Sequence, residues 1–410
     1  MELAIVVIGV PWSVHELAPA VRDAKNLGAR LRLVDTPDML DRIETSLDID
    51  TIPVRNLTAK EIVNALRRRR VDCVVSLTEM TLALAAEVRE ALGHIGTSSQ
   101  SERSVSDKAL TRLVLSKNGL TRVKFWETSL GDLPSLVQTL DLPLIVKPRA
   151  LTGSTGVRLL QTVADLADLE VQYDCDVAVH RGRDRLLVES VIVGEEVSAE
   201  AMVVNGELAL FTVTDKFNTG PPHFFEVGHI MPSRHIANWA AEIAEYLQRV
   251  VECLKIVTSP IHAELKLSEM GLELIEIHSR FGGDNIVRLL EDTFGVRAFE
   301  CYFAAMLHGD TPRAVDARQF CGVGFFTARL GQSYQPTSLN FPYPRRVVEI
   351  DFSTFRRPKL DAYEGVKLLY WRLGHCLFAS NLYDEVFDNV SFVADRLCTV
   401  SAGNLGERDR

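Results

Sequence analysis

The stretch that decides the fold is Ile261-His-Ala-Glu-Leu-Lys-Leu267, followed by Ser-Glu-Met-Gly and then by Leu272-Glu-Leu-Ile-Glu-Ile-His278. Apolar and polar residues alternate in both runs, and the short connection between them contains a glycine, a pattern typical of a β-hairpin. If Ser268 lies opposite Leu272 at the end of the turn, Glu264 lies directly opposite Glu276. The pattern therefore predicts two neighbouring carboxylates on one face of a sheet.

A positive group is expected between these glutamates, because like charges directly opposite each other destabilise a sheet. Mg²⁺ prefers carboxylate oxygens and is the natural candidate. The alternative is a solvated hairpin face on which the glutamates pair with Lys266 and Arg280, and the residues alone leave both interpretations open. In this register we expect His262 opposite His278 and Lys266 opposite Leu274 on the polar face, and Ala263, Leu265 and Leu267 opposite Ile277, Ile275 and Glu273 on the apolar face.

The composition indicates a large globular protein. The chain has 410 residues, of which 47% are hydrophobic, enough for about two to four domains. A net charge of −10 and a pI near 5.6 argue against a nucleic-acid partner, which requires a basic surface. No apolar run approaches the roughly 20 residues of a membrane span, and no cleavable leader follows Met1. We therefore expect a cytoplasmic protein without a membrane partner.

The cysteines give no sign of a disulfide framework or a zinc site. The seven cysteines are scattered, their number is odd, and no C-x-x-C pair occurs. This usage favours reduced, buried thiols.

The first hundred residues alternate short apolar runs with helical patterns, and this alternation is typical of a parallel α/β layer. Strands are expected at 3–8, 31–34 and 71–77, and residues 98–102 are interpreted as a linker. Neither G-x-G-x-x-G after the first strand nor a P-loop motif is present, so a nucleotide would have to be bound by a different motif. We expect an N-terminal α/β domain over 1–103, a second domain over 104–312 with a lid at about 122–187, and a mixed β/α region over 313–410.

A glycine-rich loop follows a buried strand in the second domain. Leu144-Ile-Val-Lys147 is expected to be that strand, and Thr152-Gly-Ser-Thr-Gly156 comes shortly after it. Such a loop offers backbone N–H groups and hydroxyls to phosphate oxygens, and Lys147 adds charge. It could equally be an ordinary turn.

Residues 215–232 contain aromatic and titratable residues together with Gly and Pro, and we interpret them as an irregular, substrate-facing loop. The strand before it, at 195–204, places Glu196, Ser198 and Glu200 on one face. Helices are expected at about 234–254 and 296–307. Beyond 312 the chain indicates strands at 321–328, 346–351 and 368–373 and a helix near 391–397, with no residue that looks catalytic.

The ordered set of segments over roughly residues 1–310 resembles the ATP-grasp superfamily. It consists of Asp107-Lys108, LIVKP, LTGSTGV, LLVES, GEEVSAEAM, HAELKL and LIEIHSRFGG. The resemblance implies a multidomain protein of the α/β and α+β classes, in which an ATP-grasp fold follows an N-terminal Rossmann-like α/β domain.

The resemblance also implies a role for individual residues. Glu264 and Glu276 match the acids that bind Mg²⁺, with Mn²⁺ as an alternative ion. His278 departs from the Asn common in the family, so its place among the metal ligands is open. Arg280 would stabilise an acyl phosphate, or else form a salt bridge. The residues implied to contact ATP are Lys108, Lys147, Ser154, Thr155, Gly156, Glu189, Ser190, Val191, Ile192, Glu196 and Lys216.

The segments DKFNTGPPHFFEVGHIMPS and HAELKL resemble the L-amino acid ligase branch. This branch implies an ATP-dependent ligase that joins small amino acid or carboxylate substrates through an acyl phosphate, with Arg280 and Lys147 in catalysis. Glu226 and His229 are candidates for amine contact or proton removal, or for loop packing. Alternatives are an enzyme that activates bicarbonate or a purine precursor, and a nucleotide-binding module without catalysis. A homodimer is common among relatives and is expected here.

Overall fold

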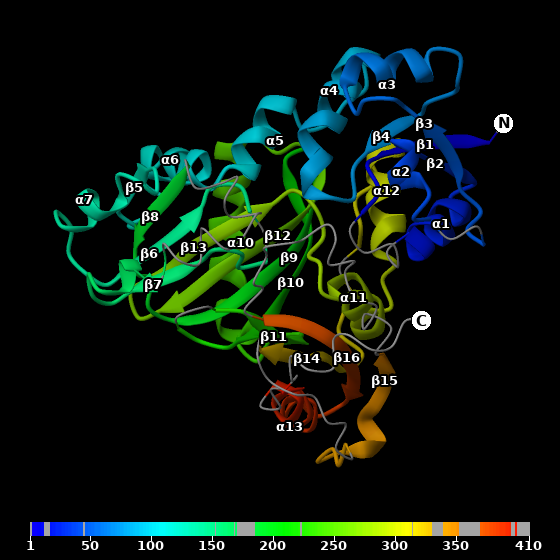
Figure 1. The fold of residues 1–410 in the computed structure, drawn as a ribbon. Coiled ribbons are helices and arrows are strands. Elements are labelled where there is room, and N and C mark those ends of the chain that lie inside the picture. The colour runs from blue at the N-terminus through cyan, green and yellow to red at the C-terminus, as the bar shows by residue number, and fades with distance from the viewer. Residues whose placement is uncertain are drawn as a thin grey trace, which may run out of the picture.

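The computed structural model describes residues 2–11, 17–43, 46–151, 153–167, 169, 185–221, 224–313, 315–329, 339–351, 370–394 and 398–399 (Figure 1). The helices are α1 (Leu17–Asn26), α2 (Pro37–Leu40), α3 (Ala59–Leu66), α4 (Leu82–Leu92), α5 (Ser99–Ser106), α6 (Lys108–Lys117), α7 (Leu133–Val137), α10 (Ile236–Leu254), α11 (Ile286–Phe294), α12 (Ala298–His308) and α13 (Tyr383–Ala394), with short 3-10 helices η2 (Glu79–Thr81) and η3 (Pro344–Arg346).

The strands form three sheets. They are β1 (Leu3–Ile8), β2 (Ala29–Asp35), β3 (Asp50–Pro53), β4 (Cys73–Val75), β5 (Phe125–Thr128), β6 (Leu144–Pro148), β7 (Arg158–Leu160), β8 (Leu186–Ser190), β9 (Glu195–Val204), β10 (Glu207–Asn218), β11 (Glu226–Met231), β12 (Ser259–Ser268), β13 (Gly271–His278), β14 (Phe320–Arg329), β15 (Val347–Asp351), β16 (Tyr370–Ser380) and β17 (Cys398–Thr399).

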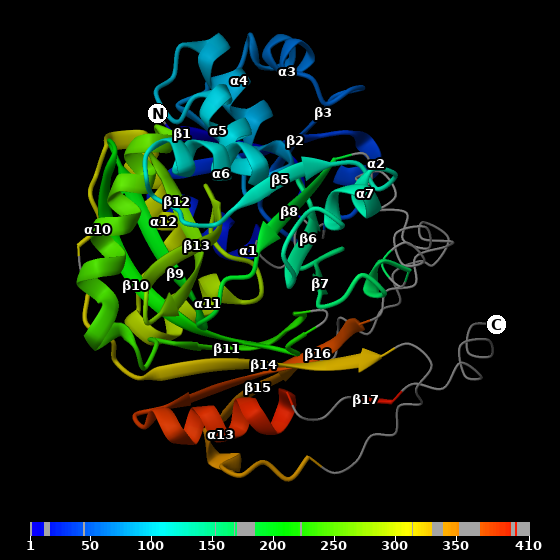
Figure 2. The same ribbon diagram turned by 90° about the vertical axis from the view of Figure 1, so that its left-hand side faces the viewer.

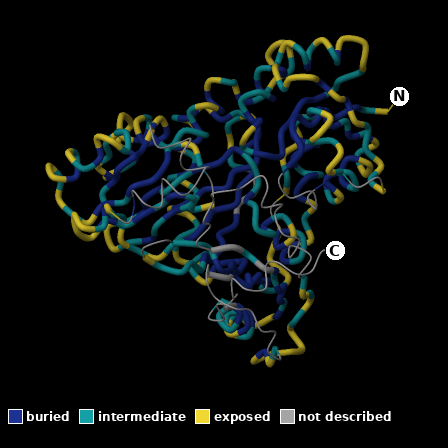
Figure 3. Tube along the Cα trace, in the orientation of Figure 1, coloured by how far each residue is buried: buried dark blue, intermediate teal, exposed yellow. Residues whose placement is uncertain are grey.

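The N-terminal sheet is parallel, in the order β3-β2-β1-β4, as the alternation of apolar runs and helices predicted. Strands β1 and β4 are buried on both faces, whereas the edge strand β3 buries only Ile52, and the tube in Figure 3 shows the buried strands inside a more exposed rim of helices and turns. Met202 and Val204 of β9 pack into the same core as β1 and α12. The N-terminal sheet is thus joined to the rest of the molecule by apolar contact.

The large sheet has nine strands, in the order β13-β12-β9-β10-β11-β14-β16-β15, with β17 paired to β14. Helix α10 packs on Val197, Val213 and other apolar residues of one face. Helix α13 covers the β11–β14–β16 part of that same face, where β-carbons added to Gly322 or Gly324 would meet α13 side chains below 3 Å. The opposite face of β13, β12, β9 and β10 is therefore free to carry polar residues.

The small sheet is antiparallel, in the order β5-β8-β6-β7. Figure 2 shows it beside the large sheet, between the N-terminal sheet and the β11–β14–β16 region. Arg112 of α6 bonds both Glu189 of β8 and backbone carbonyls of β13, and Ser154 Oγ, in the connection after β6, donates to the Phe224 carbonyl in the connection between β10 and β11. These bonds connect the small sheet with strand β13 and with the segment between β10 and β11.

The hairpin pairs Glu264 with Glu276 and His262 with His278, as predicted. The predicted pairs nearer the turn are wrong, because Ser268 pairs with Gly271 across a two-residue loop and a β-bulge at Ile275 then restores the register. Arg112 accounts for the bulge, since it donates to the carbonyls of Leu274 and Ile275 at 2.9 and 3.3 Å. The corrected pairs are Leu265 with Leu274, Lys266 with Glu273 and Leu267 with Leu272.

Four other expectations need correction. Residues 98–102 are not a linker, because Ser98 caps α5 by accepting from the Ser101 N–H. The predicted loop 215–232 contains the end of β10 and the whole of β11. The last helix is α13, earlier than predicted, and β16 extends beyond residue 373 to Ser380. Strands β14, β15 and β16 of the predicted 313–410 region extend the large sheet, while the domain boundaries themselves stay predictions.

Within the described ranges, none of the helices combines the length and the apolar character needed to cross a membrane.

Candidate active site

A row of polar side chains runs across five adjacent strands of the large sheet, on the face opposite α10. Cross-strand pairing aligns these residues: Glu276 with Glu264, Glu264 with Ser198, and Lys216 with His229. We call this surface the polar face. Its members are Glu276 and His278 on β13, His262, Glu264 and Lys266 on β12, Glu196, Ser198 and Glu200 on β9, Thr212, Thr214 and Lys216 on β10, and His229 on β11.

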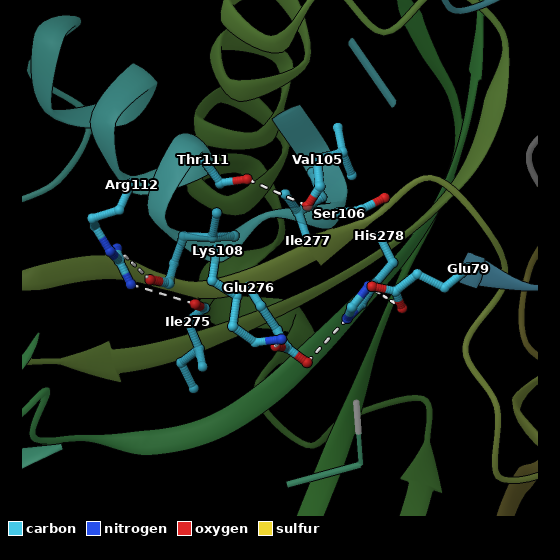
Figure 4. A pocket seen from close by; sticks show the side chains of 11 residues that line it. Glu79, Val105, Ser106, Lys108, Thr111, Arg112, Ile275, Glu276, Ile277 and His278 are labelled. Atoms are coloured by element: carbon cyan, nitrogen blue, oxygen red, sulfur yellow. Dashed lines mark hydrogen bonds and ion pairs between the residues drawn. The ribbon is translucent and has the colours of Figure 1, made fainter. Parts of the chain in front are cut away.

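The hairpin end of the polar face is a chain of ion pairs, drawn in Figure 4. Lys108 Nζ, at the start of α6, lies 2.9 Å from Glu276 Oε2 and donates to the Leu151 carbonyl at 2.6 Å. His278 Nε2 lies 3.0 Å from Glu276 Oε1. On its other side, His278 Nδ1 lies 2.9 Å from Glu79 Oε2, although that contact lacks hydrogen-bond alignment. Glu276 thus has two nitrogen-bearing neighbours, Lys108 of α6 and His278 of β13.

Glu264 has a separate set of neighbours. Lys216 Nζ contacts its carboxylate, and His262 Nε2 lies 3.6 Å away. His262 is itself held by Glu200, whose two oxygens both lie 2.9 Å from Nδ1. Each of the opposed glutamates therefore has a lysine beside it, and the metal ion predicted between them stays a prediction.

The solvated-face alternative is wrong. Lys266 pairs with Glu196 at 3.1 Å and Arg280 with Glu79 at 3.1 Å, so neither cation serves the opposed glutamates. The side chains of Glu264 and Glu276 are only 14% and 15% exposed. These carboxylates lie in a recess and not on an open surface.

Both carboxylates are held in their charged form. Burial opposes ionisation, but the charge of Lys216 lowers the pKa of Glu264 to about 2. Burial is likewise outweighed at Glu276, where Lys108 and His278 hold the pKa well below its usual range. Paired, anionic oxygen donors on one face suit a hard divalent cation such as Mg²⁺, so the donor set fits the implied metal.

Lys147 belongs to a different cluster. It is buried on β6, with Nζ 2.7 Å from Glu189 Oε2, and Glu189 also accepts from Arg112 Nε at 2.7 Å. Burial opposes the charge of Glu189, yet Lys147 and Arg112 lower its pKa. The structure therefore brings Lys147 and Glu189 together, apart from the Glu264–Glu276 pair.

The remaining residues expected to contact ATP come from several elements. Ser154, Thr155 and Gly156 follow β6, while Thr152 of the same loop lies outside the described residues. Ser190 ends β8, and Val191 and Ile192 follow it. A recess of about 680 Å³ opens beside Glu196, Lys216, Asn218 and Lys266 at the ends of β9 and β10. Clefts of a few hundred cubic ångströms are typical of small-molecule sites.

The β11 end of the polar face joins Glu226 and His229, the two residues predicted for amine contact. Glu226 contacts Lys216, and its carboxylate lies within 4.8 Å of ligand atoms of Glu196 and Glu264. Burial raises the pKa of Glu226. Because both residues lie on a strand, the expectation of an irregular loop was wrong for this part of the segment. The proximity of Glu226 to Glu264 connects the β11 end to the opposed glutamates.

The sequence did not lead us to predict three further residues that lie in the site. Glu79 reaches His278 and Arg280 from the N-terminal region, and Asp284 and Arg372 join Glu226 and His229 from the segment after β13 and from β16. Glu79 follows strand β4 closely, a position at which polar residues of parallel sheets gather, and this signal could have found it. Arg372 lies in the 313–410 region, where no catalytic residue was predicted, and it pairs with Glu226 and Asp284.

Comparison with known proteins agrees with this geometry. Residues 140–288 match the ATP-grasp domain family. The chain is 27% identical over 290 residues to alanine–anticapsin ligase of Bacillus subtilis, covering 64% of this chain and 60% of the relative. The chain thus spans less than two thirds of that relative's length.

Two solved structures share the fold. An L-amino acid ligase from Bacillus licheniformis has a TM-score of 0.72 at 19% identity, covering 98% of this chain and 99% of that one. An N5-carboxyaminoimidazole synthase from Aspergillus clavatus, solved in complex with ADP and 5-aminoimidazole ribonucleotide, has a TM-score of 0.70 at 16% identity, covering 97% of this chain and 99% of that one. At these identities the match concerns the fold alone.

Proposed function

Since this chain belongs to the ATP-grasp superfamily, we propose that it is an ATP-dependent carboxylate–amine ligase that joins an amino acid, or a related carboxylate, to an amino acid. The observation that carries this proposal is the opposition of Glu264 and Glu276 on one face, each beside its own lysine. Anionic oxygens and lysines on one face of a sheet are what phosphoryl transfer from ATP requires.

In the first step, an oxygen of the substrate carboxylate attacks the γ-phosphorus of ATP. The bond from that phosphorus to the bridging oxygen breaks, ADP leaves with the electron pair, and an acyl phosphate forms. Lys108, Lys216 and Lys147 are assigned to the phosphate charges, because fixed cations stabilise the transferred group. Arg280, held by Glu79 at 3.1 Å, is assigned to the acyl phosphate.

Glu264 and Glu276 would hold Mg²⁺, which supplies charge neutralisation at the phosphates when bound. His278 is held between Glu276 and Glu79 and is assigned to positioning. An imidazole suits softer metals than Mg²⁺.

In the second step, the amine nitrogen attacks the acyl carbon, the bond to the phosphate oxygen breaks, and inorganic phosphate leaves. An ammonium group must lose one proton before attack and the amide nitrogen loses another afterwards. Glu226 and His229 are assigned to this work, because the pKa of Glu226 is raised by burial and no hydrogen bond within the described chain occupies the His229 ring.

The test is ATP turnover in the presence of Mg²⁺ and pairs of amino acids, with ADP, phosphate and peptide measured together. We expect peptide and ADP in equal amounts with at least one pair. Hydroxylamine should trap the acyl phosphate as a hydroxamate when the amine substrate is omitted. ADP release that depends on bicarbonate and needs no amine would instead favour the carboxylase alternative, and binding of ATP without turnover would favour a regulatory module.

A further inference from the structure

The carboxylate of Asp107, the residue before Lys108, joins helix α6 to the segment that follows strand β6. Its Oδ1 accepts from the Ala109 N–H at 3.0 Å and so caps the start of α6. The same carboxylate accepts from two nitrogens of Arg149, from Nε at 2.9 Å and from Nη2 at 2.7 Å. The reaction outlined above uses neither residue. We call them the Asp107–Arg149 pair.

Helix capping alone does not account for this pair. Asparagine and serine cap a helix about as well as aspartate, so the cap itself needs no negative charge. The side chains of Arg149 and Asp107 are only 11% and 14% exposed. Because a two-pronged contact between an arginine and a carboxylate fixes the relative orientation of both groups, the pair sets the position of the chain at Arg149 relative to the start of α6.

Two further bonds attach Lys108 to the same segment. The Lys108 N–H donates to the Arg149 carbonyl at 3.0 Å, and Lys108 Nζ donates to the Leu151 carbonyl at 2.6 Å. Lys108 Nζ also lies 2.9 Å from Glu276 Oε2, and Figure 4 shows the lysine beside that carboxylate. The Lys108 side chain is thus held between residues 149–151 and strand β13.

The glycine-rich loop begins directly after residues 149–151. Ser154, in this loop, donates from Oγ to the Phe224 carbonyl at 3.0 Å. The chain from Arg149 to Ser154 is therefore attached at both ends, to α6 by the Asp107–Arg149 pair and to the connection between β10 and β11 by Ser154. Loss of the pair would release the end that carries the Leu151 carbonyl, the partner of Lys108.

We propose that Asp107 and Arg149 are positioning residues that hold Lys108 Nζ where it meets the phosphates of ATP. This assignment rests on the proposed function, in which Lys108 contacts those phosphates. A lysine has a flexible four-carbon stem, and fixing it in advance reduces the entropy that is lost when a ligand binds. The effect of the pair on the nucleotide passes through Lys108 and requires no contact of Asp107 or Arg149 with ATP.

The test is equilibrium binding of nucleotides to the full chain by calorimetry, with Mg²⁺ and without amino acids. The probes are a non-hydrolysable ATP analogue and adenosine, which lacks the phosphates. Asp107→Asn keeps the helix cap and removes the charge. We expect Kd for the ATP analogue to rise about tenfold, the scale found for partners that orient metal ligands. Kd for adenosine should change less than about twofold, whereas a general loss of structure would weaken both probes.

Arg149→Gln tests the pair from its other side and keeps the test decisive if Asp107→Asn folds poorly. The backbone of Arg149 still bonds Lys108 and Arg185 in this variant. We expect the same selective rise in Kd for the ATP analogue.

Asp72→Asn is the matched control. Asp72 also accepts from Nε and Nη2 of one arginine, Arg70, at 2.6 and 2.9 Å, and from a backbone N–H, that of Ala4, at 2.8 Å. It lies in the N-terminal region, and its replacement should change neither Kd.

Lys108→Met separates an effect through Lys108 from a direct contact with the nucleotide. In a Lys108→Met background, Asp107→Asn and Arg149→Gln should each change Kd for the ATP analogue by less than about twofold, because residues that act through a third lose their effect when it is removed. A tenfold effect that persists in this background would overturn the assignment.

Equal weakening of the ATP analogue and adenosine, or no change in either, would also overturn it. Amide formation by the wild type together with unchanged ATP binding by Asp107→Asn would remove this inference alone. ATP binding that depends on Asp107, without turnover of any pair of amino acids, would remove the proposed ligase function alone.

Discussion

The two ends of the polar face carry the same kinds of side chain in different states. At the hairpin end, His262 and His278 each have a carboxylate oxygen within 3.0 Å of a ring nitrogen. At the β11 end, His229 has its nearest carboxylate oxygen at 3.7 Å and no hydrogen bond within the described residues. The two hairpin-end histidines are thus each held by a carboxylate, whereas the His229 ring has no hydrogen-bond partner among the described residues.

The largest effect is expected from removing Lys216, which contacts glutamates at both ends of the polar face, and Lys108, which contacts only Glu276 of the opposed pair, is the comparison. Lys216 touches Glu226 and Glu264 and lies 3.7 Å from Glu196, so Lys216→Met leaves three close carboxylates without a shared cation. We expect a loss of about 3–5 kcal/mol of unfolding free energy, the usual cost of breaking a buried ion pair. Urea unfolding without divalent ions measures it.

Lys108→Met is the matched variant, because Glu276 keeps His278 as a neighbour. It should lose less stability than Lys216→Met. Added Mg²⁺ should restore stability to Lys216→Met more than to Lys108→Met. An equal loss in the two variants would mean that the ends do not differ in charge compensation.

Glu276→Gln should lower turnover by about a hundredfold or more, because metal-assisted charge stabilisation contributes several kcal/mol and each 1.4 kcal/mol is a factor of ten. Removing the residue to Ala would leave Lys108 buried without this partner, so Gln is the gentler change. ADP release measured against Mg²⁺ concentration gives the effect. Glu269→Gln, on the exposed hairpin turn, is the control and should behave as wild type.

Glu79→Gln tests whether the hairpin end depends on the N-terminal region. This change removes the charged partner of Arg280 and His278, and we expect kcat to fall about tenfold with KM for ATP nearly unchanged, as for the loss of one charge-assisted hydrogen bond. A large rise in KM for ATP with kcat intact would contradict a positioning role. Steady-state kinetics separates the two.

The smallest expected effect concerns Glu102, behind the hairpin end. Burial raises its pKa to about 7, and Ser279 donates to it. A raised folded-state pKa means that this residue's contribution to stability is complete below the ordinary value of 4.5 and is lost as the pH rises through 7. Unfolding free energy should fall over that window, by no more than about 1.4 kcal/mol per pH unit for one proton.

Glu102→Gln should remove this component of the pH dependence, because the amide oxygen can still accept from Ser279 and carries no charge. Denaturant unfolding at several pH values between 4.5 and 7.5 measures both proteins. An unchanged slope in the variant would show that another group titrates.

Part of the site follows from local pattern. A strand alternates its side chains between two faces, so the sequence 261–278 was enough to place Glu264 and Glu276 on one face and opposite each other. The prediction was correct at these two residues because two features that the sequence did not reveal shift the strand register in opposite directions. The turn is one residue tighter than expected, and the bulge at Ile275 compensates, because Arg112 from a distant helix binds the carbonyls of Leu274 and Ile275.

Local composition misled the interpretation of residues 215–232. Gly, Pro and aromatic residues there indicate a loop, yet pairing with β9 and β14 makes strands of both ends. Strand formation at such positions is decided by neighbouring strands more than by propensity.

The order of motifs along the chain determined the ATP-grasp fold and the identity of its opposed acids, because hydrophobic period and motif spacing are local properties. Only the tertiary structure decided which cation stands beside each acid, and that Glu79, Asp284 and Arg372 join them. These residues lie far apart in the chain, and the pairing of buried charges depends on distances in space. Neither hydrophobic periodicity nor motif spacing contains information about these distances.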